Sequence, residues 1–299
     1  MTEASSSPLP PIYEESSQYR HWRFSPSQIW DTRKSNHEAA VERVRRNFQE
    51  DQRESQEATT NDLKYLSVDD ELVLCRFFES QLQGICSHFK FPDVVMATAV
   101  IYMKRFYLHN TVMDYHPKDV LLTCLFLATK SEGERISIEQ FVLDLQLPDS
   151  DVVLGLEFIV SQGLKFEYLI HHPYRPAYGF FLDMQTISGM DIQPLKETYT
   201  KVQRIIKSML LTDVCLIYQP SQLALAAFVI AGKETSFDAK VISYIETRFG
   251  SEQKDQLLQM FDKIADILEH VTVSKDEARV IDRQLRMCMN PANNPDSAL

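Results

Sequence analysis

The clearest signal of the fold is His116-Pro-Lys-Asp-Val-Leu-Leu-Thr-Cys-Leu-Phe-Leu-Ala-Thr-Lys130. This pattern recurs in outline 103 residues later as Gln219-Pro-Ser-Gln-Leu-Ala-Leu-Ala-Ala-Phe-Val-Ile-Ala-Gly-Lys233. Proline, alanine and lysine occupy matching places in the two copies. Proline suits the first turn of a helix, where its missing N–H group is not needed. The residues that follow are apolar on nearly every side, which predicts a buried helix. A buried helix that occurs twice predicts two copies of one helical domain.

Length and charge limit what the chain can be. Its 299 residues suit two domains better than one. The net charge of −11 argues against a nucleic-acid surface, because phosphate contacts need basic side chains, although a basic patch on one face is still open. Neither glycine-rich phosphate-binding pattern, G-x-G-x-x-G or G-x-x-x-x-G-K-S/T, occurs in the chain, which argues against nucleotide chemistry of those kinds.

Cysteines and histidines are spaced in a way that predicts no metal site and no disulfide framework. Five cysteines without a C-x-x-C pair favour reduced, mostly buried thiols. The neighbours His171 and His172 cannot easily ligate one ion together, and no further ligands are suitably spaced. No apolar run approaches the roughly 18 residues of a membrane span, and the start of the chain lacks a secretory signal. We therefore expect no cofactor and no membrane contact.

The apolar periodicity predicts an all-α protein with two tandem five-helix repeats, flanked by an N-terminal and a C-terminal helix. Ser25, Pro26 and Gln28 have the pattern of a helix start, with serine as the cap. The expected divisions are a disordered tail at 1–19, an N-terminal segment and helix at 20–56, repeat 1 at 57–166, repeat 2 at 167–272, and a C-terminal helix and tail at 273–299.

Capping signals and prolines set the expected helices inside the two repeats. In repeat 1 they cover residues 67–89, 93–108, 116–130, 137–147 and 149–164. In repeat 2 they cover residues 174–187, 192–217, 220–233, 237–248 and 251–271. A last helix is expected from a capping box at Ser274 to about Met289.

Large aromatic residues stand in the polar N-terminal segment and need a surface that covers them. They are Trp22 and Phe24, followed by Trp30 on the expected N-terminal helix. A mostly polar helix outside the repeats can pack on its own domain or on a partner. Both alternatives are open from the sequence, so these three aromatic residues are candidate accessory contacts with a partner.

Several motifs together resemble the cyclin family, in the form of its cyclin H branch. The first is Met103-Lys-Arg-Phe-Tyr-Leu108, followed by Val112-Met-Asp-Tyr-His-Pro117 and the buried stretch that ends at Lys130. The opening Arg20-His-Trp-x-Phe24 is fairly specific to that branch. His172-Pro-Tyr-Arg-Pro176 is shared with the cyclin C branch. The resemblance spans about residues 16–290 and implies the cyclin fold for both repeats.

The resemblance implies a regulatory subunit and not an enzyme. Members of the cyclin H branch bind and activate the cyclin-dependent kinase of transcription factor H, the CDK-activating kinase, together with a RING-finger assembly subunit. The complex phosphorylates the repeat tail of RNA polymerase II in transcription initiation. The expected partners are thus this kinase, the RING-finger subunit and the core of transcription factor H, in the nucleus and without direct nucleic-acid contact.

Two alternatives share the fold. One is a cyclin C subunit of the Mediator kinase module, against which the Arg20-His-Trp-x-Phe24 opening speaks. The other is a promoter-binding protein of the transcription-factor-B type. That class needs a zinc ribbon and basic repeats, whereas this chain has no C-x-x-C pair and a net charge of −11.

By family position, the kinase contact falls on Lys130 and Glu157. Cyclins use a lysine at the end of the third helix of the first repeat and a glutamate on the fifth, so these helices must pack side by side. Leu127 and Phe166 would flank the pair as apolar contacts. From the residues alone, Lys130 is better explained as a cation at a helix C terminus, worth roughly 0.3–1 kcal/mol. Glu157 could be a plain solvated charge, and Leu127 and Phe166 could simply pack in the core. Lys233 is expected to be structural.

The chain departs from the family pattern directly after this lysine. Cyclins usually continue with one residue and then two acids, whereas Ser131-Glu-Gly-Glu134 places Gly133 at the second acidic position. The end of this helix is therefore expected to differ, and no contact from an acid at residue 133 is predicted.

Overall fold

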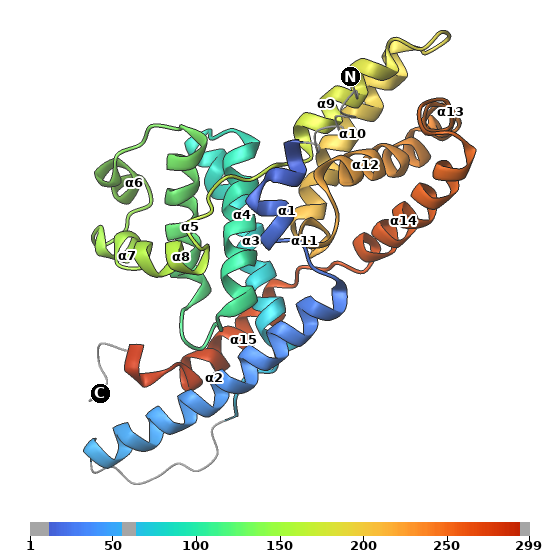
Figure 1. Cartoon of the computed structure of the whole chain (residues 1–299). Helices are drawn as coiled ribbons and strands as arrows, with labels where there is room; N and C mark the ends of the chain where they lie inside the picture. Colours follow the sequence, from blue (N-terminus) through green and yellow to red (C-terminus); the bar gives the residue numbers. More distant parts are fainter. Residues whose placement is uncertain (1–11, 56–63, 294–299) are drawn as a thin grey trace, which may run out of the picture.

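The computed structural model describes residues 12–55 and 64–293, and all regular structure in these two ranges is helical. Two helical bundles lie side by side, with α2 (Pro26–Ser55) and α15 (Lys275–Cys288) at the lower end of the first (Figure 1). The prediction of an all-α protein with two repeats and flanking helices is confirmed.

Repeat 1 is built around one buried helix, α5 (Pro117–Glu132). The His116 side chain caps it by accepting a hydrogen bond from the backbone N–H of Lys118, and Pro117 lies in its first turn. Every residue from 120 to 129 is buried, because neighbouring helices cover α5 on all sides. Those neighbours are α3 (Val68–Phe89), α4 (Asp93–His109), α7 (Asp151–Leu154) and α8 (Glu157–Gly163). The short helix α6 (Ile138–Asp144) adds Phe141, whose ring centre is 5.4 Å from that of Phe126.

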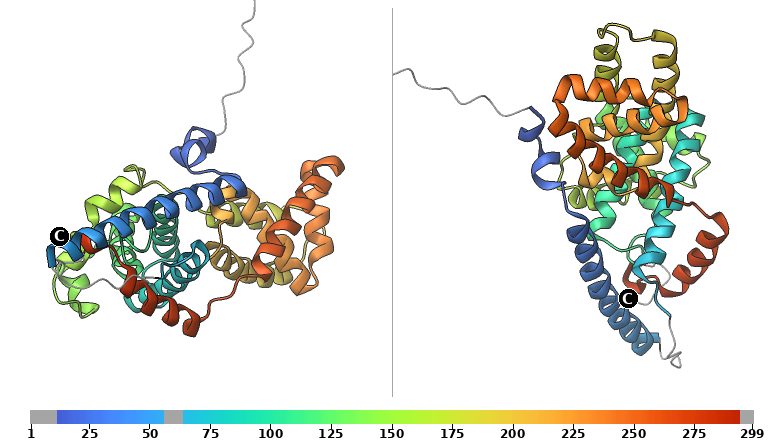
Figure 2. Two further views of the ribbon diagram at one scale, coloured as in Figure 1. Left: turned by 90° about the horizontal axis from the view of Figure 1, so that it is seen from below. Right: turned by 90° about the vertical axis from the view of Figure 1, so that its right-hand side faces the viewer.

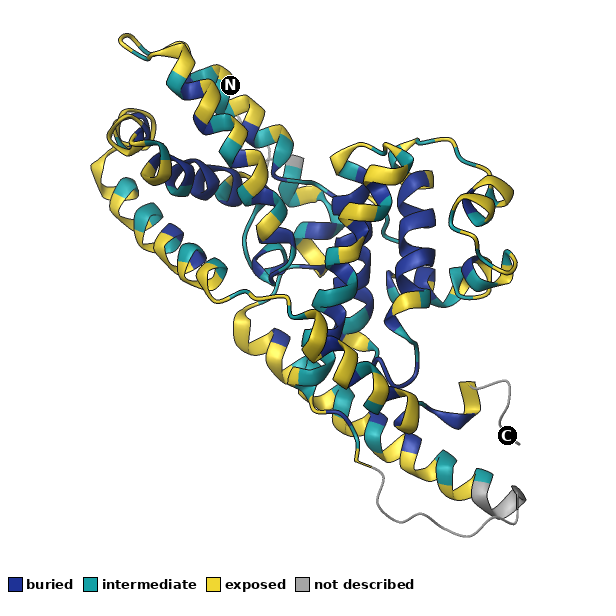
Figure 3. Cartoon of the chain, turned by 180° about the vertical axis from the view of Figure 1, so that it is seen from behind, coloured by how far each residue is buried: buried dark blue, intermediate teal, exposed yellow. Residues whose placement is uncertain are grey.

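Repeat 2 reproduces this plan around α12 (Pro220–Thr235). The backbone N–H of Gln219 donates to the side chain of Gln222, 3.0 Å away, at the start of the helix. Both central helices are buried along most of their length (Figure 3). The other helices are α9 (Tyr174–Met184), α10 (Ile192–Leu210), α11 (Val214–Ile217), α13 (Asp238–Phe249) and α14 (Ser251–Glu269).

Two helices expected to be continuous are broken. The helix predicted at 149–164 divides into α7 and α8, with a turn at Gly155 and Leu156 where the Leu156 backbone, at φ −97 and ψ −1, departs from regular α-helix angles. The helix predicted at 192–217 ends at Leu210. Beyond it, the Thr212 hydroxyl donates to the carbonyl of Met209 and accepts from the backbone N–H of Val214, which turns the chain into α11.

The N-terminal segment is more ordered than its composition suggests. The predicted disordered tail at 1–19 is wrong for residues 12–19, which form η1 (Ile12–Glu15) and the start of α1 (Ser17–His21). Ser16 caps α1, and the Tyr13 ring packs edge-on against His171. Residues 1–11 lie outside the described ranges. The contact between the Tyr13 and His171 rings explains why residues 12–19 are ordered. Composition alone does not reveal such a contact with a residue far along the chain.

Helix α2 runs without a break and packs on repeat 1. Asn36 donates its side-chain amide to the backbone oxygen of Leu108, so a polar residue in mid-helix is used for attachment. Ala40 and Val44 share a buried cluster with residues of α3 and α15. Seen from below, α2 spans the underside of repeat 1 (Figure 2). The sequence left open whether this helix packs on its own domain or on a partner. In the structure, the apolar face of α2 packs on the chain's own domain.

Candidate functional site

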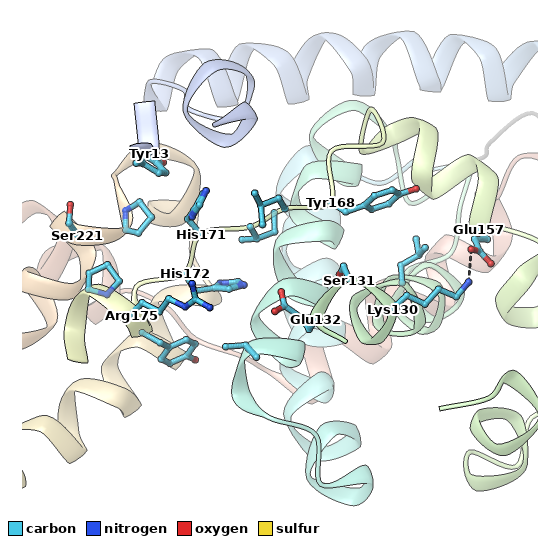
Figure 4. A pocket seen from close by; sticks show the side chains of 17 residues that line it. Tyr13, Lys130, Ser131, Glu132, Glu157, Tyr168, His171, His172, Arg175 and Ser221 are labelled. Atoms are coloured by element: carbon cyan, nitrogen blue, oxygen red, sulfur yellow. Dashed lines mark hydrogen bonds and ion pairs between the residues drawn. The ribbon is translucent and has the colours of Figure 1, made fainter. Parts of the chain in front are cut away.

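Lys130 and Glu157 converge on one face of repeat 1. Lys130 lies in the last turn of α5 and Glu157 is the first residue of α8. These helices pack side by side, which places the lysine Nζ 2.7 Å from Glu157 Oε1 (Figure 4). The ammonium group also lies 4.5 Å from the centre of the Phe126 ring. The two charged groups are thus held in place by the ends of two helices.

This ion pair contributes little to folding. The side chains are 47% and 32% exposed, and pairs of that kind are worth roughly 0–1 kcal/mol. Lys130 also offsets the negative end of the α5 dipole, as the residue-level explanation expected, and Glu157 offsets the positive end of α8. An ammonium carries three N–H donors and this pair uses one. Hydrogen-bonding capacity is therefore left for a second molecule.

Apolar side chains lie beside the pair. Phe166 is 54% exposed and its ring centre is 6.1 Å from that of Phe158, which is 69% exposed. Leu127 is buried in the core of repeat 1, yet it lines the same groove as Lys130 and the exposed Leu169. Sequence reasoning missed Phe158 and Leu169. The sequence did hold a signal for Phe158, because this aromatic residue directly follows Glu157 and lies outside the apolar stripe of α8.

A groove of about 1100 Å³ extends from Lys130 and Glu157 to the start of repeat 2. Its far end is lined by His171, Arg175 and Ser221, and η1 adds Tyr13 (Figure 4). Both repeats and the N-terminal segment therefore form one continuous surface around the ion pair.

Helix α5 ends at Gly133, the position where the family pattern has its second acid. Gly133 has φ +79, a left-handed conformation that glycine adopts without strain, and its N–H donates to the carbonyl of Thr129. Glu132 turns inward, where its carboxylate accepts a hydrogen bond from the Thr98 hydroxyl at 2.6 Å. The Thr98 oxygen is also 2.7 Å from His172 Nε2. Burial, with a smaller effect of Arg105, lowers the pKa of His172 to about 3, so this imidazole is neutral at pH 7 and joins the repeats by hydrogen bonding.

The three N-terminal aromatic residues lie in different environments. Trp22 is 1% exposed and its indole N–H donates to Glu167, so the prediction that it contacts a partner is wrong. Phe24 is half-buried beside Leu108 and Leu216. Trp30 is 45% exposed, and its role as an accessory contact stays a prediction.

Residues 12–55 and 64–293 contain no group of three or more His, Cys, Asp or Glu side chains arranged to hold a metal ion. No helix within these ranges is both long enough and apolar enough to span a bilayer.

The chain belongs to the cyclin family. Residues 50–168 match the N-terminal cyclin domain and residues 172–273 the C-terminal cyclin domain. Among curated relatives, it is 31% identical to cyclin mcs2 of Schizosaccharomyces pombe over 290 residues, 96% of this chain and 88% of that protein. It is 35% identical to cyclin CCL1 of Saccharomyces cerevisiae over 254 residues, 82% of this chain and 63% of that protein. Cyclin-H of Xenopus laevis is 33% identical over 73% of this chain and 68% of its own length.

Solved structures point to the same branch. The chain superimposes with a TM-score of 0.81 on one in the CAK complex of Chaetomium thermophilum bound to ATP-γ-S, at 28% identity, covering 93% of this chain and 89% of the other. It superimposes with a TM-score of 0.70 on one in the yeast TFIIK complex (Kin28/Ccl1/Tfb3), at 32% identity, covering 86% of this chain and all of the other. The relatives named here thus include cyclins of the H type and cyclins of CAK and TFIIK complexes.

Proposed function

We propose that this chain is the regulatory subunit of a cyclin-dependent kinase of the transcription factor H type, the CDK-activating kinase. One observation carries the proposal: an exposed lysine–glutamate pair, Lys130 and Glu157, fixed by two helix ends beside exposed Phe158 and Phe166. The pair adds little to stability, so a recognition role accounts for it better than a structural one.

The proposed contact is a helix end on the small lobe of the kinase. Lys130 would bind backbone carbonyl groups and Glu157 backbone N–H groups, while Phe158, Phe166 and Leu169 bury apolar area. Docking would press the kinase αC helix inward, so that its glutamate pairs with the β3 lysine and the activation loop becomes ordered. A stable complex needs a total buried area above about 1,200 Å². The chain itself supplies no catalytic group in this mechanism.

The relatives support a particular set of partners. The TFIIK complex contains Kin28, Ccl1 and Tfb3, and the chain resembles its cyclin over the whole length of that subunit. We infer a kinase of the Kin28 type as the direct partner, a RING-finger assembly subunit as the third component, and the transcription factor H core as the larger assembly. The inferred role is phosphorylation of the RNA polymerase II repeat tail during transcription initiation, in the nucleus and without direct contact with nucleic acid.

A cyclin C subunit of the Mediator kinase is the second candidate. Cyclin-C1-1 of Arabidopsis thaliana is 28% identical, but the match covers only 56% of this chain and 66% of that protein. The matches to the H-type cyclins above cover 73–96% of this chain, which favours the first candidate.

Kinase activation tests the proposal. The purified chain is mixed with the catalytic subunit of the transcription factor H kinase or of the Mediator kinase, and each mixture receives a polymerase-tail repeat peptide. We expect stimulation of the first kinase alone. Stimulation of the second alone would establish the cyclin C assignment. Absence of stimulation, with no complex on gel filtration, would refute both.

A further inference from the structure

A strained turn carries Phe166. Lys165 and Phe166 follow α8 with φ +55 and +58, so two consecutive residues with side chains adopt the left-handed conformation. Such residues cost roughly 1–2 kcal/mol each. Within the turn, the N–H of Phe166 donates to the Ser161 carbonyl and that of Glu167 to the Leu164 carbonyl, at 2.9 and 3.0 Å. Contacts with residues outside the turn must therefore offset the remaining strain energy.

Glu167, the next residue, is held at three points. Its carboxylate lies 2.6 Å from His21 Nδ1 through one oxygen and accepts the indole N–H of Trp22 at 2.6 Å through the other. Its backbone oxygen accepts a hydrogen bond from Arg105 Nη1 at 2.9 Å. Hydrogen bonds to an ionised acceptor are roughly twice as strong as neutral ones. The end of the turn is therefore tied to the N-terminal segment on one side and to α4 on the other.

Trp22 is the centre of this arrangement. Its ring lies 4.5 Å from the guanidinium of Arg105 and 5.1 Å from the ammonium of Lys165, the first residue of the strained turn. Arg105 is buried, and two of its nitrogens, Nε and Nη2, have no hydrogen-bond partner. Burial lowers the pKa of this guanidinium to about 9, so it is still charged at pH 7 and attracted to the ring. Trp22 thus contacts the turn through both Lys165 and Glu167.

We propose that His21 and Trp22 are positioning residues for kinase binding: they hold Glu167, and through it the left-handed turn that presents the Phe166 ring beside Phe158. The inference rests on the proposed function, because it takes Phe166 to be part of the kinase contact. It gives a role to the Arg20-His-Trp-x-Phe24 motif, whose tryptophan is buried and cannot touch a partner itself. The N-terminal segment then affects kinase binding indirectly, by positioning Phe166, without contacting the kinase itself.

The decisive variant is Trp22→Phe, which keeps an aromatic ring and removes the indole N–H donated to Glu167. We expect the Kd for the kinase catalytic subunit, measured by calorimetry, to rise roughly fivefold. A change of that size corresponds to the free energy of one hydrogen bond. Phe166→Ala should raise Kd by tenfold or more if the ring anchors the kinase. In the Phe166→Ala background, Trp22→Phe should change Kd less than about twofold, because coupled residues are not additive. Equal effects in both backgrounds, or none in either, would overturn the inference.

Tyr244→Phe is the matched control. It also removes one hydrogen bond to a carboxylate, since the Tyr244 hydroxyl donates to Asp183 Oδ2 at 2.8 Å in repeat 2. We expect a smaller fall in melting temperature, because the ring volume of Tyr244 is kept, and an unchanged Kd. If this variant weakens kinase binding as much as Trp22→Phe does, general destabilisation explains the loss and the positioning role is wrong.

A second readout needs no kinase. Hydrogen exchange of the Phe166 and Glu167 amides should become faster in Trp22→Phe and stay unchanged in Tyr244→Phe, because only the first loosens the turn. Unchanged exchange in Trp22→Phe overturns the inference.

If Phe166→Ala and reversal of the Lys130–Glu157 pair both leave Kd unchanged, the proposed function fails and the positioning role fails with it. If those changes raise Kd and Trp22→Phe does not, the positioning role alone fails.

Discussion

The charged residues of the candidate site contribute little to the stability of the fold. Lys130 and Glu157 form one exposed ion pair, and Lys233 and Asp262 form another at the corresponding place in repeat 2, where Nζ and Oδ1 are 3.2 Å apart. Both pairs are too exposed to contribute much to folding. The repeat 1 pair differs in having exposed Phe158 next to it in the sequence. A charge reversal can therefore separate recognition from folding.

The first prediction is that Lys130→Glu combined with Glu157→Lys weakens kinase binding by at least tenfold. The reversed pair can still form within the chain, so folding is kept, but each charge now repels the backbone group that its predecessor would bind. Pull-down and calorimetry with the kinase catalytic subunit measure the effect. Circular dichroism should show unchanged helicity and a melting temperature within a few degrees of the original.

The same reversal in repeat 2, Lys233→Glu with Asp262→Lys, is the control. It changes equivalent charges on the same fold and should leave kinase binding unaltered, in line with the structural role expected for Lys233. Kinase binding of full strength after the repeat 1 reversal would refute the assignment of Lys130 and Glu157.

At the level of elements, helix ends decide the shape of the site. Helix α5 stops at Gly133, whose left-handed conformation lets the chain leave the helix directly after Glu132. Helix α8 begins with Glu157 because α7 stops early, at Leu154. Each charged residue of the pair therefore lies at a helix terminus of favourable sign.

The second prediction concerns this helix end. Gly133→Ala should lower the free energy of unfolding by about 1 kcal/mol, because alanine is strained at φ +79 although no atom lies within 4 Å of the added methyl group. Gly84→Ala, at an exposed position inside α3 that also has nothing within 4 Å, should instead stabilise by up to about 1 kcal/mol. Urea unfolding of both variants measures the contrast. A neutral Gly133→Ala would contradict the left-handed cap.

For the whole molecule, the N-terminal helix joins the two repeats. Arg33 of α2 donates two hydrogen bonds to Asp213, which precedes α11 in repeat 2, at 2.6 and 2.8 Å. Burial by itself would raise the pKa of Asp213, but the hydrogen bonds and charge of Arg33 outweigh it and hold the pKa at about 2. Other residues of α2 pack on repeat 1, so this helix bridges the two bundles.

The third prediction is that Asp213→Asn lowers the free energy of unfolding by about 1–2 kcal/mol at pH 7. The pKa is about 2 in the folded chain against an ordinary 3.8, so the carboxylate contributes fully above pH 3.8. Its contribution is lost as the pH falls through about 2. The difference between the original chain and the variant, from urea unfolding at several pH values, should therefore shrink between pH 4 and pH 2.

A second cross-repeat pair provides the comparison. Lys207 and Asp93 lie 2.8 Å apart between α10 and α4, but their side chains are more exposed than Arg33. Lys207→Gln should cost less than 1 kcal/mol. Equal losses in Lys207→Gln and Asp213→Asn would show that the Arg33 bridge has no special part in joining the repeats.

Prediction from sequence succeeded where the signal is local. Helices start at Pro117 and Pro220 as predicted, and the Ser25 hydroxyl caps α2 by accepting the backbone N–H of Gln28. These signals and the apolar runs after them are encoded within one or two helical turns. It failed at Leu156 and Thr212, where a turn interrupts an apolar pattern that would suit a continuous helix. It also failed for residues 12–19, whose polar composition suggests disorder.

Local sequence patterns were enough to predict two buried central helices, their proline starts, the all-helical class and the family. These depend on hydrophobic periodicity and on hydrogen bonds between near neighbours in the chain. The burial of Trp22 and the binding of Glu167 from two sides depend on tertiary contacts. So does the placement of the exposed Phe166 ring on a strained turn. Those features join residues far apart in the chain, and no local pattern encodes which distant carboxylate will accept the N–H of a given tryptophan.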